Sequence, residues 1–109
     1  MPKYVVLADH TPDICPSSNA RTRARALEGL GPEALPKVMA EHQVSFVLEP
    51  MHLDPSHRTI AIVEAPNVEA VVGFVNDSGL SQWNTVEVSP TTPIGELMAT
   101  VEESPIVFD

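Results

Sequence analysis

The sequence is poor in positive charge and in cysteine. It contains six lysines and arginines against 15 aspartates and glutamates, which gives a net charge of −9. A surface this acidic repels phosphate backbones and anionic membranes, so we expect no nucleic acid and no membrane among the partners of the protein. The one cysteine cannot form a disulfide within the chain, which favours a reducing compartment.

Long apolar runs are also lacking. No run approaches the roughly 20 residues that a membrane-spanning helix needs. The start of the chain, MPKYVVLADH, holds an apolar run that is too short for a secretory signal, and acids follow it at once. These absences predict a cytoplasmic protein.

The residues that are present predict four strands. A chain of 109 residues is enough for one domain with one core, so we expect a single domain over 1–109 with a tail at 104–109. Residues 3–9 and 57–65 have continuous apolar centres, which are typical of strands covered on both faces. Residues 44–53 and 84–89 alternate between apolar and polar side chains, which is typical of edge strands.

Helical patterns fill the intervals between these strands. Residues 18–42 predict one broken crossover helix, and residues 66–79 predict a second helix. A last helix is expected after Pro93, because Ile94, Leu97, Met98 and Val101 recur at the spacing of one helix face. The order β-α-β-β-α-β with an additional C-terminal helix predicts an α+β protein with a ferredoxin-like antiparallel sheet.

The ferredoxin-like plan leaves one face of the sheet without helices. In that plan the first and third strands are central, and these are the strands that are apolar on both faces. We therefore expect the second face to be covered as well. A second copy packed sheet to sheet would cover it, so we expect a homodimer or a higher homo-oligomer.

The chain resembles a known superfamily over nearly its whole length. The segments that carry the resemblance are YVVLADH, VSFVLEPM, TIAIVEAPNVEAVVGFV and GLSQWNTVEVSPTTP. They are similar to the dimeric α+β barrel superfamily, which includes muconolactone isomerase-like, antibiotic-biosynthesis monooxygenase-like and small GYD-type proteins. The resemblance implies dimerisation into a dimeric α+β barrel, with a pocket between sheet and helices in many members. Their activities differ widely, so the fold alone does not determine the function.

Four residues predict a metal site at one end of the sheet. His10 and Cys15 follow the first strand, and His52 and His57 belong to the hairpin between the second and third strands. The plan places both loops at the same end of the sheet. Imidazole and thiolate groups are ligands for zinc, copper or iron. The alternative is a buried packing cysteine beside exposed loop histidines.

Cys15 and His10 are also the candidates for catalysis. Cys15-Pro16-Ser17-Ser18 precedes a predicted helix, whose dipole and free N–H groups would lower the pKa of the cysteine and favour its thiolate. Whether the protein is an enzyme stays open at this point.

Two other functions fit the sequence. A small-molecule enzyme would use a pocket between sheet and helices, with Asp9, His42 and Trp83 as polar contacts on an apolar wall. His42 could equally be a core histidine that bonds a backbone carbonyl, and Trp83 a packed residue at a strand entry.

Arg21 and Arg25 lie on one helix face and would bind an anionic ligand, or else form a solvated face. Finally, an assembly or sensing module without catalysis would dock its apolar tail, Pro105 to Phe108, on a neighbour.

Overall fold

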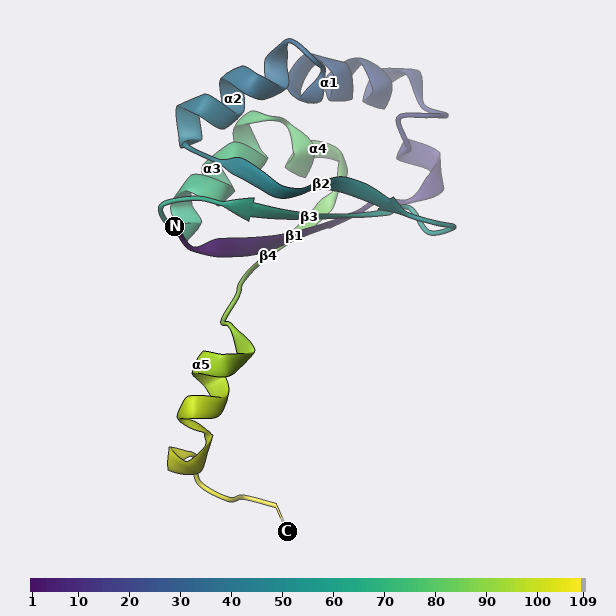
Figure 1. Cartoon of the computed structure of the whole chain (residues 1–109). Coiled ribbons are helices and arrows are strands. Elements are labelled where there is room, and N and C mark those ends of the chain that lie inside the picture. The colour runs from purple at the N-terminus through teal and green to yellow at the C-terminus, as the bar shows by residue number, and fades with distance from the viewer. Residues whose placement is uncertain (109) are drawn as a thin grey trace.

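A computed structural model describes residues 1–108 as a four-stranded sheet with helices. The elements in chain order are β1 (Lys3–Asp9), η1 (Pro12–Ile14), α1 (Ala20–Leu30), α2 (Ala34–His42), β2 (Ser45–Leu53), β3 (Arg58–Glu64), α3 (Val68–Asp77), α4 (Leu80–Trp83), β4 (Thr85–Pro90), α5 (Ile94–Ala99) and η2 (Val101–Glu103). Figure 1 shows their arrangement. No helix in the described part of the chain has the length and apolar content to cross a membrane.

The four strands form one antiparallel sheet in the order β2-β3-β1-β4. The sequence predicted β1 and β3 as the central strands and β2 and β4 as the edges, and the structure agrees. In β1, Val6 lies opposite Ala61 of β3 on one side and opposite Val88 of β4 on the other. This α+β arrangement is compatible with a ferredoxin-like fold.

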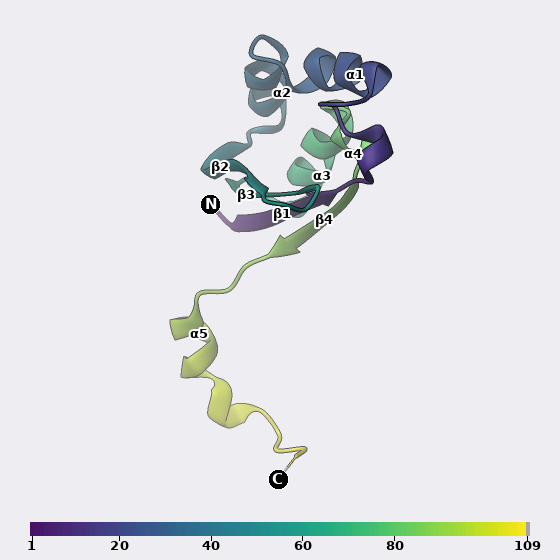
Figure 2. The same ribbon diagram turned by 90° about the vertical axis from the view of Figure 1, so that its right-hand side faces the viewer.

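Helices cover only one face of the sheet, as Figures 1 and 2 show. Successive side chains of a strand point to opposite faces, so alternate residues of the central strands enter the core beneath the helices. The buried core consists of Tyr4, Val6, Val44, Ala61, Val63, Ala65, Val71, Phe74 and Val75.

Two of the covering helices begin with the same asparagine cap. The side-chain oxygen of Asn19 accepts from Thr22 N, and that of Asn67 accepts from Ala70 N. Each bond satisfies a first-turn N–H that has no partner within the helix, and such a cap is worth about 1 kcal/mol.

No helix or loop among residues 1–108 covers the opposite face of the sheet. We call it the open face. Its apolar residues are Val5, Leu7, Leu48, Met51, Ile60 and Ile62, which lie opposite one another in the strand register. The expectation that a second copy covers this face concerns the assembly and stays a prediction.

The C-terminal segment, residues 91–108, projects away from the sheet, and we call it the arm (Figures 1 and 2). The radius of gyration is 16.6 Å, whereas a compact domain of this length has about 13 Å. All residues of the arm are exposed. The predicted last helix exists, but its apolar face is exposed and packs on no part of the sheet or of the other described helices.

Candidate functional site

His10, Cys15 and His57 meet at one end of the sheet. His10 directly follows β1, Cys15 follows η1, and His57 directly precedes β3. Because β1 and β3 are antiparallel, the end of one strand lies beside the start of the other, and His10 N donates to His57 O at 3.1 Å. One ligand atom from each of the three side chains lies within 4.8 Å of the others. We call this group the His–Cys cluster.

Asn84 fixes the orientation of the His10 ring. His10 Nδ1 lies 2.9 Å from Asn84 Oδ1, and the amide nitrogen of Asn84 donates to Leu80 O at 3.1 Å. The side-chain oxygen of an amide only accepts hydrogen bonds, so His10 Nδ1 carries the proton. In the neutral ring Nε2 then has a free lone pair, and this atom is buried without a hydrogen-bond partner in the described chain. A histidine held this way by a polar neighbour is typical of metal ligands.

The thiol of Cys15 is buried at 9% exposure and lies 2.9 Å from Ser17 Oγ. The Ser17 hydroxyl, followed by the Ser17 backbone N–H, is the main cause that lowers the pKa of Cys15 from 9.0 to about 6, and burial of the thiol opposes this effect. At neutral pH the thiolate, which is the nucleophile and the metal ligand, is therefore the main form.

The helix dipole is not the cause of this low pKa, contrary to the sequence-based interpretation. Helix α1 begins only at Ala20, and its capping residue is Asn19. Cys15 lies several residues earlier, in the loop. The dipole acts only within the first turn of a helix. The hydrogen bonds of Ser17, two residues after the cysteine, lower the pKa instead.

Side chains of α1 and its cap hold the loop around Cys15. Arg23 Nε donates to Pro16 O at 2.9 Å, and Arg23 Nη2 donates to Ser17 O at 2.8 Å. Asn19 Nδ2 donates to Asp13 O at 3.0 Å. The role of Arg23 at this site was not predictable from the sequence, because its partners are backbone carbonyls that any residues would supply.

The Trp83 ring lies beside the His–Cys cluster. The centroid of the His10 ring lies 5.2 Å from that of His57 and 5.2 Å from that of Trp83. Three buried nitrogens have no hydrogen-bond partner in the described chain: His10 Nε2, His57 Nδ1 and Trp83 Nε1. Buried polar atoms are nearly always paired, so three unpaired ones on neighbouring rings indicate a place for a ligand.

No family model, curated protein or solved structure matches this chain. The geometry of the site is therefore the only guide to its chemistry.

Two predicted residues near this end of the sheet stay outside the cluster. The His52 ring is exposed, and its Nδ1 lies 2.6 Å from Asp54 Oδ1 within the same hairpin. Asp9 is exposed at the end of β1, opposite Arg58. The structure thus brings together three of the four predicted metal ligands, and His52 is the one left out.

His42 lies at the far end of α2 and does not reach the cluster. Its Nε2 is 2.6 Å from Asp77 Oδ2, and its ring fills the space above Gly73, where a Cβ would lie 2.7 Å from the ring. The partner is thus a carboxylate of α3 and not the backbone carbonyl that was considered from the sequence.

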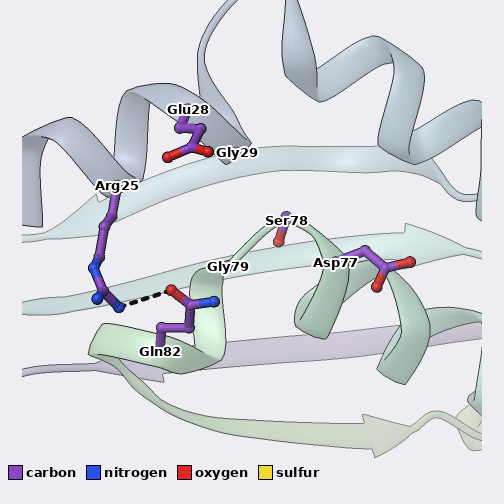
Figure 3. A pocket seen from close by; sticks show the side chains of 7 residues that line it. All are labelled: Arg25, Glu28, Gly29, Asp77, Ser78, Gly79 and Gln82. Carbon is purple, nitrogen blue, oxygen red and sulfur yellow. Dashed lines mark hydrogen bonds between the residues drawn. The ribbon is translucent and has the colours of Figure 1, made fainter.

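Figure 3 shows a hollow between α1 and the turn from α3 to α4, and the Arg25 side chain is part of its lining. It measures about 490 Å³ and is lined by Arg25, Glu28, Gly29, Asp77, Ser78, Gly79 and Gln82. Arg25 Nη1 donates to Gln82 Oε1 at 2.9 Å, and two carboxylates share the hollow with it. This mixed charge gives little support to the predicted anion site. Arg21, the other predicted residue, is exposed.

A second, apolar pocket lies between the sheet and the helices. Its volume is about 230 Å³, and its lining is Val6, Leu30, Leu35, Phe46, Pro50, Ala61, Val63, Phe74 and Leu80. None of the predicted polar contacts, Asp9, His42 and Trp83, is among these residues. The pocket therefore offers apolar contact and no side chain that transfers a proton.

Proposed function

We propose that this protein binds a transition-metal ion through His10, Cys15 and His57. The observation that carries the proposal is the meeting of three ligand atoms within 4.8 Å of one another, where one nitrogen of each histidine ring is buried and has no partner in the described chain. A metal ion is the ligand that satisfies two imidazoles and a thiolate at once.

The donor atoms select the metal. Thiolate and imidazole favour zinc or copper, whereas magnesium and calcium prefer oxygen ligands. Zinc bonds of about 2.0 Å to nitrogen and 2.3 Å to sulfur place the ligand atoms of a tetrahedral site roughly 3.5 Å apart, so a small closure of the cluster suffices. We infer zinc as the preferred ion. Three protein ligands leave a fourth position open, and a zinc ion there would act as a Lewis acid on whatever occupied it.

The residues around the cluster support metal binding by Cys15 more than they support a role of Cys15 as a free nucleophile. Asn84 holds the proton on His10 Nδ1, which leaves Nε2 with its lone pair available as a ligand. Trp83 Nε1 is a donor without a partner in the described chain, and it would bond to a group beside the metal. The catalytic roles of Cys15 and His10 remain predictions that await a substrate.

A zinc titration of metal-free protein against a chromogenic chelator tests the proposal. We expect one zinc per chain in the wild type and loss of that binding in Cys15→Ala. His52→Ala is the matched control, because His52 lies outside the cluster and should keep wild-type affinity. Equal zinc binding by wild type and Cys15→Ala would reject the site.

We further infer membership of the dimeric α+β barrel superfamily, and with it a homodimer. The support is the sheet order β2-β3-β1-β4 with helices on one face only, which leaves an apolar face for a partner.

The second candidate function is binding of an apolar small molecule, and the pocket of about 230 Å³ between the sheet and the helices supports it. A cavity of about 150 Å³ holds benzene, so a substituted aromatic ring would fit. Saturable binding of such a compound by calorimetry, abolished by the space-filling Leu35→Trp, is expected. Binding that Leu35→Trp leaves unchanged would place the compound elsewhere.

A further inference from the structure

Trp83 carries a buried hydrogen-bond donor that no described residue satisfies. Nε1 of its indole ring is buried without a partner in the described chain, and an indole N–H group donates but does not accept. A buried donor that is left unpaired destabilises the fold. A bound group with an acceptor atom is therefore expected beside the indole ring.

The Trp83 ring lies against one of the proposed metal ligands. The centroids of the Trp83 and His10 rings are 5.2 Å apart, at an interplanar angle of 57°. Zinc bonds to nitrogen and to oxygen are each about 2 Å long, so a zinc ion on His10 Nε2 and the atom bound beyond it extend about 4 Å from that nitrogen. A ligand of the metal can thus reach the indole ring.

The described part of the chain supplies no carboxylate and no third histidine to the metal. Among residues 1–108, the group of ligand atoms at this end of the sheet consists of His10, Cys15 and His57 alone. The carboxylates that are nearest in the sequence, Asp9 and Asp13, belong to exposed residues. A ligand from outside the chain therefore takes the fourth position that three protein ligands leave open on zinc.

Charge and hydrogen bonding both select an anion for this fourth position. A zinc ion with one thiolate and two neutral imidazoles keeps a net positive charge, which a monovalent anion neutralises in a buried site. An amine would spend its single lone pair on the metal and turn only N–H donors toward Trp83. An anion such as a carboxylate or azide has a further acceptor atom, and a charge-assisted hydrogen bond to that atom is stronger than a neutral one.

We propose that the His–Cys cluster and its metal take up a small anion, which binds the metal with one atom and accepts a hydrogen bond from Trp83 Nε1 with another. This ligand class rests on the proposed metal site, because the metal supplies the positive charge. The nitrogens that would surround the anion, His10 Nε2, His57 Nδ1 and Trp83 Nε1, are all buried, so the space suits an anion of a few atoms. Trp83 is the residue that determines this specificity.

A nuclear magnetic resonance titration observes the proposed hydrogen bond directly. The single tryptophan of the sequence gives a single indole N–H signal in a proton–nitrogen correlation spectrum of labelled protein. We expect sodium azide, added to zinc-loaded protein at constant ionic strength, to move this signal to higher proton frequency until it saturates. Metal-free wild type and zinc-treated Cys15→Ala should show no such shift. A signal that stays in place in zinc-loaded protein, or that moves equally without metal, would overturn the proposal.

Removal of the N–H group alone measures what the contact contributes. Trp83→Phe keeps an aromatic ring beside His10 but lacks the donor, and azide affinity is measured from the visible absorption of cobalt-substituted protein. We expect about 10- to 100-fold weaker azide binding, with zinc and cobalt affinities close to wild type. His52→Ala is the matched control and should bind azide as the wild type does, because His52 pairs with Asp54 outside the cluster.

The two experiments separate failure of the anion site from failure of the metal site. Azide affinity that is unchanged in Trp83→Phe would reject the role of Trp83 and leave the metal site standing. A wild-type protein that binds neither zinc nor cobalt would reject both.

Discussion

Asn84 should control metal affinity without touching the metal. Replacing it by leucine removes the acceptor that lies 2.9 Å from His10 Nδ1. The proton of His10 is then free to move to Nε2, the atom that the metal requires, and the ring loses its fixed orientation. Partners of this kind typically contribute 10–100-fold to metal affinity, so we expect zinc binding by Asn84→Leu to weaken by about that factor, or roughly 1.4–2.8 kcal/mol.

Asn84→Asp separates this effect from damage to the fold. The aspartate keeps an acceptor for His10 Nδ1 but, like leucine, loses the donor to Leu80 O. Zinc affinity is measured by chelator competition, and thermal unfolding of the metal-free proteins shows the structural cost. We expect Asn84→Asp to bind at least as tightly as wild type although both variants lose stability. If the two variants lose affinity equally, the reasoning about the His10 proton is refuted.

Three other predictions concern the reactivity of Cys15, the pH dependence of stability and two glycines. In metal-free protein, alkylation of Cys15 should show a midpoint near pH 6, and Ser17→Ala should raise that midpoint. Because folding lowers the pKa of Cys15 from 9.0 to about 6, stability should rise between pH 6 and 9 and lose this contribution as the pH falls through 6, as denaturant titrations would show. Gly29→Ala should destabilise the fold, since its Cβ would overlap the Ser78 carbonyl, whereas Gly95→Ala meets no atom within 4 Å and should be neutral or slightly stabilising.

The sequence predicts the site as far as topology determines it. The continuous apolar runs of β1 and β3 identify these strands as central, and antiparallel pairing then brings His10 and His57 together. His52 is different, because its ring is exposed and its Nδ1 lies 2.6 Å from Asp54 Oδ1 within the same hairpin. The topology places this hairpin at the correct end of the sheet, but it does not determine which way a side chain of the hairpin turns.

The polar partners that hold the site together were not predictable either. Asn84 is 74 residues from His10 in the chain, and Arg23 bonds to the carbonyls of Pro16 and Ser17. Nothing in the local pattern around these residues marks them. The arm shows the opposite case, because the stripe of Ile94, Leu97 and Met98 predicts a helix correctly but gives no information on what covers it.

X-ray absorption spectroscopy of the zinc-loaded protein tests the central claim most directly. The account predicts one zinc per chain with a single sulfur ligand at about 2.3 Å and two imidazole nitrogens at about 2.0 Å. The sulfur contribution should disappear in Cys15→Ala and persist in His52→Ala. A zinc shell of oxygen and nitrogen without sulfur in the wild type would contradict the account.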